Sequence, residues 1–113
     1  MMEKEKEEMI NINQLDTIEI GVGSRLVHTF TLHESVGYNA SYEISDEDVV
    51  ELIEKRYTYR HPERMKDPQI TGADEALGEF IFLARSTGRA VISIYFEFRF
   101  EIERSHQVEV IVQ

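Results

Sequence analysis

The sequence predicts an all-β chain, folded as an immunoglobulin-like antiparallel β-sandwich of about seven to eight strands. Segments in which apolar and polar residues alternate recur along most of the chain, and this period of two is typical of half-buried strands. Turn-forming residues separate these segments at the spacing expected of a sandwich. The connections are too short for helical crossovers between parallel strands. A small closed barrel is the alternative architecture.

The first half of the chain contains the clearest alternating segment. Over residues 25–32, Leu26, Phe30 and Leu32 fall on one face, whereas polar residues fall on the other. His28 has the phase of the apolar face, which predicts a histidine in the core or at a strand end. The other strands expected in this half cover residues 10–13, 17–20 and 38–44.

The second half is expected to begin with a short turn and a strand. Residues 45–48 resemble a helix cap, but the alternation around Tyr57 and Tyr59 favours a strand within residues 49–60. The longest irregular region is expected at residues 61–78, which contain both prolines. Later strands are expected at residues 79–85, 90–100 and 107–112, with the polar stretch 101–106 turning into the last of them.

The charge of the chain restricts the classes of partner. With 22 acidic and 12 basic residues the net charge is −10, so a phosphate backbone would repel the surface and nucleic acid is not an expected partner. A cationic cleft would attract the same surface, although an acidic balance also keeps a protein soluble. There is no cysteine, which excludes disulfides, thiolate catalysis and cysteine-based metal sites.

The length of the chain predicts a single domain, and its N-terminus bears on the cellular compartment. We expect residues 1–9 to be a charged, flexible N-terminus and residues 10–113 to be a single β-sandwich domain. No run is long enough for a membrane span, so no membrane partner is expected. The N-terminus lacks the apolar stretch of a secretory signal. The expected location is the cytoplasm as the sequence is written, or the periplasm or exterior if a leader was removed.

The connection after the segment 25–32 has an order of residues suited to a binding loop. Gly37 has the backbone freedom to turn tightly and to bring main chain close to a partner. Taken alone, this glycine is also explained as an ordinary hairpin turn, with Tyr38 packed on the core. The candidate binding residues in this connection are His33, Glu34, Ser35, Val36, Gly37 and Tyr38.

From about residue 15 to residue 113 the chain resembles the chagasin-type inhibitors of cysteine peptidases. In that family the first binding loop reads Asn-Pro-Thr-Thr-Gly-Tyr/Phe. Gly37 and Tyr38 match this motif, Ser35 replaces a threonine, and His33, Glu34 and Val36 depart from it. The resemblance implies an immunoglobulin-like sandwich whose three loops at one end enter the active-site cleft of papain-like enzymes.

The second loop of the family contains a Gly-x-Gly-Gly stretch before a strand with a phenylalanine. The counterpart here reads Gly72, Ala73, Asp74 and Glu75, followed later by Phe80. The first glycine fits and the paired glycines do not. The resemblance implies a second contact region at these four residues, with an acidic tip in place of a glycine-rich one.

The third loop of the family follows a tyrosine with Arg-Pro-Trp/Phe. Tyr95 is in place, but Glu97 stands where the family has arginine, and no proline precedes Phe98 and Arg99. The resemblance implies contacts from Glu97, Phe98 and Arg99. Phe98 and Phe100 could be aromatic anchors in contact with the partner. They also continue the apolar phase of the segment 90–100, which favours core positions, and periodicity does not decide between these two alternatives.

The resemblance implies a reversible protein inhibitor of papain-like cysteine peptidases, acting as a monomer by occluding the cleft. The alternative is a non-inhibitory immunoglobulin-like module whose loops have drifted to another protein partner. No histidine pair has the spacing of a zinc helix and no Gly-x-Ser-x-Gly elbow is present, so we expect neither an enzyme nor a cofactor or metal.

Overall fold

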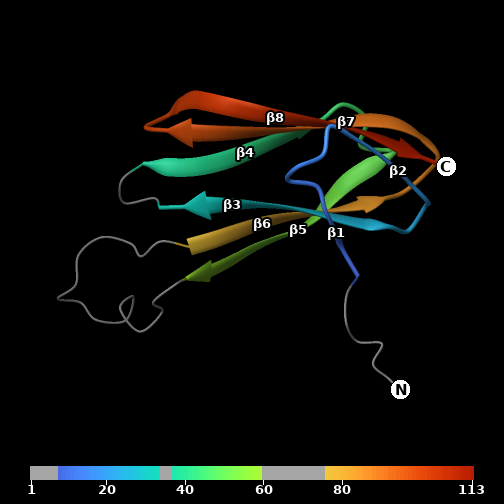
Figure 1. Cartoon of the computed structure of the whole chain (residues 1–113), viewed down its shortest axis with the longest axis horizontal. Coiled ribbons are helices and arrows are strands. Elements are labelled where there is room, and N and C mark those ends of the chain that lie inside the picture. Colours follow the sequence, from blue (N-terminus) through green and yellow to red (C-terminus); the bar gives the residue numbers. More distant parts are fainter. Residues whose placement is uncertain (1–7, 34–36, 60–75) are drawn as a thin grey trace, which may run out of the picture.

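The computed structural model describes residues 8–33, 37–59 and 76–113, and these form two four-stranded sheets packed face to face (Figure 1). The first sheet has the order β1-β3-β6-β5 and contains β1 (Ile10–Asn11), β3 (Arg25–Leu32), β6 (Ala76–Ala84) and β5 (Val50–Tyr59). The second has the order β2-β8-β7-β4 and contains β2 (Thr17–Ile20), β8 (Glu101–Val112), β7 (Gly88–Phe98) and β4 (Tyr38–Ile44). None of the described ranges contains a helix with the length and apolar character that a membrane crossing requires.

The strand order confirms the predicted immunoglobulin-like sandwich. The N-terminal segment is divided between the sheets: β1 pairs with β3 and β2 pairs with β8, both in parallel. The other pairings in both sheets are antiparallel. Because each four-stranded sheet keeps its own edge strands, the alternative of a closed barrel is not observed.

Apolar side chains on the facing sides of the sheets form one core. Phe80 and Phe82 of β6 and Ile92 and Ile94 of β7 are fully buried within it. Burial of a side chain of this size stabilises the fold by about 1.5–3 kcal/mol. Gly78 belongs to this inner face, since a Cβ there would overlap the ring of Phe30.

Several strand boundaries differ from the expectation: the strand predicted at residues 10–13 is shorter, the one predicted from residue 90 begins at Gly88, and three further differences lie at the end that carries the predicted loops. The irregular region was expected to continue to residue 78, but β6 already begins at Ala76 because Gly78 is needed beneath the Phe30 ring. The strand expected to continue to residue 100 ends at Phe98, since the chain reverses over two residues. The polar stretch 101–106, expected as a turn, forms the first half of β8, because backbone pairing with β7 does not require apolar side chains.

Three connections leave the sandwich from one end, which we call the tip end. The cross-strand pairs Leu32–Ala76 and Tyr59–Ala76 lie at this end of the first sheet, and Tyr38–Phe98 lies at the same end of the second (Figure 1). The connections β3–β4, β5–β6 and β7–β8 therefore start and finish here. Gly72, Ala73, Asp74 and Glu75, expected in the second of these, lie outside the described residues.

Candidate functional site

A pair of backbone hydrogen bonds closes the β3–β4 connection. The His33 N–H donates to the Tyr38 carbonyl over 3.3 Å, and the Tyr38 N–H donates to the His33 carbonyl over 3.1 Å. Gly37 comes directly before Tyr38 and has φ = +96°, a conformation that favours glycine. The two ends of the predicted binding loop are thus held together. The residues between them, 34–36, are not among those the structure describes.

Gly37 also contacts the β7–β8 connection directly. Its carbonyl accepts a hydrogen bond of 2.9 Å from the Arg99 N–H. A Cβ built on Gly37 would lie 2.9 Å from Cγ and 3.2 Å from the backbone nitrogen of Arg99. Only glycine therefore allows this approach, and two connections far apart in the sequence become one unit.

The β7–β8 hairpin turns over two residues with unusual backbone geometry. Phe98 pairs with Glu101, so Arg99 and Phe100 alone make the reversal. Both have positive φ, +53° and +72°, as the type I′ turn favoured in two-residue hairpins requires. Asn and Gly are the usual residues there, and a non-glycine residue in this region costs about 1–3 kcal/mol. Strain of this kind is concentrated at functional sites, which makes the turn a candidate contact.

Aromatic rings gather around this turn. The Phe100 side chain is completely exposed, with a relative accessibility of 101 %, at the point of the hairpin. Tyr38 and Phe98 stack with ring centroids 4.7 Å apart, and the Arg99 guanidinium lies 5.0 Å from the Phe98 centroid. Tyr38 retains 43 % of its surface exposed. The tip end therefore combines a stiff aromatic base with one projecting ring.

A β-bulge directs the side chains at the root of the hairpin. Phe96 pairs with Arg104 and Glu97 with Ile102, so Glu103 is an extra residue in β8. Glu97 accepts a hydrogen bond of 2.8 Å from the Ser41 hydroxyl, on the outer face of the second sheet. Ile102, opposite Glu97 in the ladder, is 59 % exposed. Glu97 lies beside the tip, and its carboxylate is already engaged within the sheet.

The structure brings five of the residues predicted for the site into one cluster. These are His33, Gly37, Tyr38, Phe98 and Arg99. Beside them lies a cavity of about 310 Å³ that Glu97, Glu103 and Arg104 help to line.

Phe100 and Ile102 were missing from the predicted set. Phe100 continues the apolar phase of β7, and no Gly or Asn marks the turn that directs its ring outward. Ile102 faces outward because of the bulge, which alternation along β8 does not indicate. The sequence therefore left Phe100 undecided between an aromatic contact and a core position, and it contained no local signal for Ile102.

The chemistry of the tip end is that of a binding surface. Among the described residues no group of three or more His, Asp or Glu side chains is arranged to hold a metal ion. The histidine that joins this cluster, His33, contributes backbone hydrogen bonds. What the cluster offers is exposed aromatic area, one guanidinium and a backbone held in a single conformation.

Comparison with solved structures finds proteins of the same fold. The cysteine protease inhibitor EhICP2 from Entamoeba histolytica superposes with a TM-score of 0.70 at 14 % identity, over 93 % of this chain and 94 % of that one. The chain has the fold of this inhibitor. PbICP-C, solved in complex with falcipain-2, gives 0.53 at 11 % identity over 94 % and 99 %. Amebosin, from a solution structure, gives 0.56 at 19 % identity over 93 % and 96 %.

The likeness is one of fold. At these identities few side chains are shared, and no protein-family model and no curated protein matches the sequence. The resemblance to chagasin-type inhibitors suggested by the sequence is confirmed at the level of the fold. The contact residues stay a prediction that rests on the geometry of the tip end.

Proposed function

We propose that this protein is a reversible inhibitor of papain-like cysteine peptidases, which occludes the active-site cleft with its tip end. The observation that carries the proposal is the direct contact of Gly37 with Arg99. That contact joins two of the connections that the resemblance assigns to peptidase binding. The likeness in fold to EhICP2, and to PbICP-C in its complex with falcipain-2, supports the same class of partner.

The tip end has the physical properties that such an inhibitor needs. A backbone fixed by the hydrogen bonds of His33, Tyr38 and Arg99 loses little conformational entropy on docking, and this preorganisation favours affinity. Exposed aromatic residues are enriched among those that dominate binding energy, and Phe100 is placed to act as the anchor. No covalent step is required, so binding is reversible.

The direct test is titration of the purified protein against several papain-like peptidases, with residual activity measured on a peptide substrate. We expect competitive inhibition with an inhibition constant below about 1 μM, since interfaces of this kind reach at least that affinity. A serine peptidase treated in the same way controls for non-specific loss of activity. Full activity of every cysteine peptidase at micromolar protein would exclude the proposal.

The departures from the family motif favour one competing function, a module of the same fold that binds another protein. Glu97 in place of arginine is the main departure, and it is engaged by Ser41. The triple change Glu34→Pro, Val36→Thr and Glu97→Arg discriminates between the two. Little change from an already strong inhibition supports the inhibitor. A large gain from a weak starting value indicates a scaffold whose loops serve a different partner.

A further inference from the structure

Two histidines, one buried and one partly buried, form a pair between the sheets, away from the tip end. His28 of β3 is 2 % exposed, and its Nε2 lies 2.9 Å from Nδ1 of His106 on β8. The His106 Nε2–H donates to the Leu15 carbonyl over 2.7 Å. Leu15 lies between β1 and β2, where the chain crosses from one sheet to the other. We call His28 and His106 the histidine pair, and it links both sheets and this crossover.

The hydrogen bonds of the histidine pair determine how many protons it holds. The Leu15 carbonyl can only accept, so His106 carries its proton on Nε2 and accepts from His28 through Nδ1. The third contact joins Nδ1 of His28 and the Thr29 carbonyl over 3.2 Å. Two neutral rings supply two N–H groups for these three contacts. A third proton satisfies all of them, and a fourth places N–H against N–H and breaks the link.

The surroundings of His28 oppose charge on its ring. Burial lowers the pKa of His28 to about 4, and the neighbouring His106 and Arg104 favour the neutral form further, against the opposing effect of the Thr29 carbonyl. Phe96 of β7 packs against His28 with ring centroids 5.9 Å apart. The Arg104 guanidinium stacks on the same Phe96 ring, 3.8 Å from its centroid.

The remaining charge near the pair comes from the crossover. Asp16 lies there, 3.9 Å from Nε2 of His106, but it is almost fully exposed and therefore screened. The other polar side chains of this segment, Asn13 and Gln14, line a cavity that also borders His28 and His106, and both are neutral. Among the residues that the structure describes, no buried carboxylate is therefore placed to stabilise a second charge on the pair.

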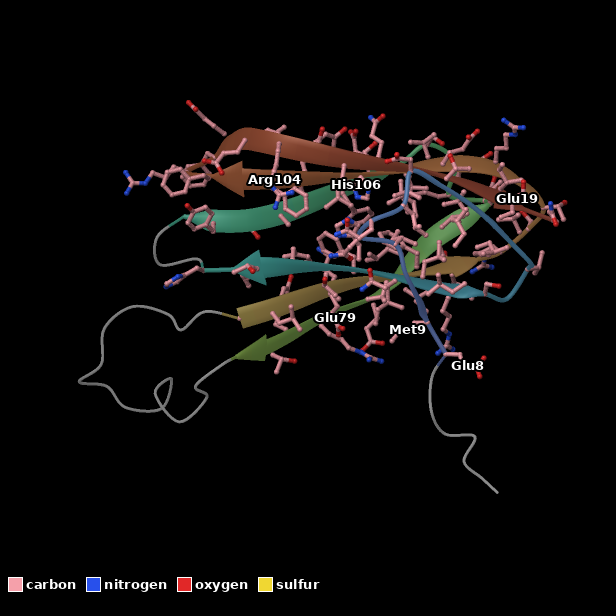
Figure 2. The ribbon with its side chains drawn as sticks, in the orientation of Figure 1. Glu8, Met9, Glu19, Glu79, Arg104 and His106 are labelled. Atoms are coloured by element: carbon pink, nitrogen blue, oxygen red, sulfur yellow. The ribbon has the colours of Figure 1, made fainter. Side chains whose placement is uncertain are left out.

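The histidine pair also anchors the root of the hairpin. The ladder between β2 and β8 covers Glu109–Val112, so residues 101–108 pair with β7 alone. Within the described part of the chain, His106 is the one residue of that stretch with hydrogen bonds to anything other than β7. Both it and Arg104 project from β8 toward the first sheet (Figure 2). If these hydrogen bonds were lost, residues 101–108 of β8 would be held by their pairing with β7 alone.

We propose that the histidine pair is an acid-sensitive link between the β7–β8 hairpin and the body of the sandwich, and that charging both of its rings weakens binding of the tip end to a peptidase. Binding weakens because a hairpin released at its root loses preorganisation. The second half of this statement rests on the proposed function, whereas the first half concerns the free protein.

The first half is tested by NMR on the free wild-type protein from about pH 7 to about pH 3. We expect the ring signals of His28 to titrate near pH 4, below the range of an ordinary histidine. Amide exchange of residues 104–107 should rise with acidification relative to a His28→Gln variant at the same pH. Residues 109–112, paired on both sides, serve as the internal control. Titration of His28 in the ordinary range, or equal exchange in both proteins, would overturn the link.

The second half is tested by the ratio of inhibition constants of wild type and His28→Gln on one peptidase, because the titration of the peptidase cancels in that ratio. Relative to its value at pH 7, we expect the ratio to shift about twofold against the wild type at pH 4, the limit that linkage sets for a group whose pKa in the free protein is about 4. A ratio independent of pH, with normal inhibition at pH 7, would overturn the coupling. Absence of inhibition at pH 7 would instead overturn the proposed function, and the NMR result would still decide the link. If His28→Gln does not fold, His106→Gln replaces it in both tests.

Discussion

Phe100 is the single residue on which the proposed binding energy depends most. Its ring is fully exposed and makes no packing contribution to the fold, so Phe100→Ala should leave the midpoint of urea denaturation within experimental error. The same change should raise the inhibition constant by at least about tenfold, the loss typical of a truncated aromatic anchor. Enzyme inhibition and urea denaturation of the same preparation provide both values.

Val22 offers the matched control for this change. It is 56 % exposed, in the turn between β2 and β3 at the opposite end of the sandwich. Val22→Ala should alter neither stability nor inhibition. An equal loss of inhibition in the Val22 and Phe100 variants would show that the ring has no specific role.

Gly37 makes a second residue-scale prediction. Gly37→Ala forces a positive φ on alanine and places a Cβ against Arg99, so the free energy of unfolding should fall by about 1–3 kcal/mol. Inhibition should weaken as well, because the contact between the two connections is lost. Thermal unfolding measures the first effect. Gly21→Ala is the control, since nothing lies within 4 Å of the added Cβ and the change should be close to neutral.

At the scale of the element, the turn of the β7–β8 hairpin is strained, and it exposes the ring of Phe100. Arg99 and Phe100 occupy positions that Asn and Gly would adopt with less strain. The double change Arg99→Asn and Phe100→Gly should therefore raise the free energy of unfolding by about 1 kcal/mol, allowing for the lost contact of Arg99 with Phe98. Urea denaturation measures this gain.

The same double variant should inhibit less well than the wild type, because it lacks the anchor. A combined gain in stability and loss of inhibition is the result expected of strain kept for function. A double variant that is less stable than the wild type would show that the positive φ values of this turn are not strained.

How far the strands could be predicted depends on what each one packs against. β3 alternates because one face is covered by the core, and its predicted bounds agree with those observed. Residues 101–105 of β8 are exposed, so nothing imposes a pattern on them, and the polar stretch was interpreted as a turn. Gly78 was placed in a loop for a similar reason: its role is to make room for Phe30, a residue 48 positions earlier in the sequence.

At the scale of the whole molecule, the buried His28 makes stability depend on pH. Its folded pKa of about 4 lies below the ordinary value of 6.5, so between these values the unfolded chain binds more protons than the folded one. The free energy of unfolding should therefore fall as the pH falls from about 6.5 toward 4. Each unit of pKa difference contributes about 1.4 kcal/mol at most.

Urea denaturation at about pH 7, 5.5 and 4.5 checks this dependence. His28→Gln should lose less stability than the wild type over the same interval, since it has no buried imidazole to charge. His33→Gln, which removes a half-buried histidine just beyond the end of the same strand, should follow the wild type. Parallel curves for wild type and His28→Gln would contradict the prediction.

The sequence by itself determined that this chain is a β-sandwich with a turn at Gly37, because alternation and turn chemistry are local properties. Only the tertiary structure decided that Gly37 meets Arg99, that Phe100 projects from the hairpin, and that His28 pairs with His106. Each of these facts depends on residues distant in sequence being brought together, or on where a strand stops. Such distances are set by the packing of two sheets, and no pattern within a single strand records them.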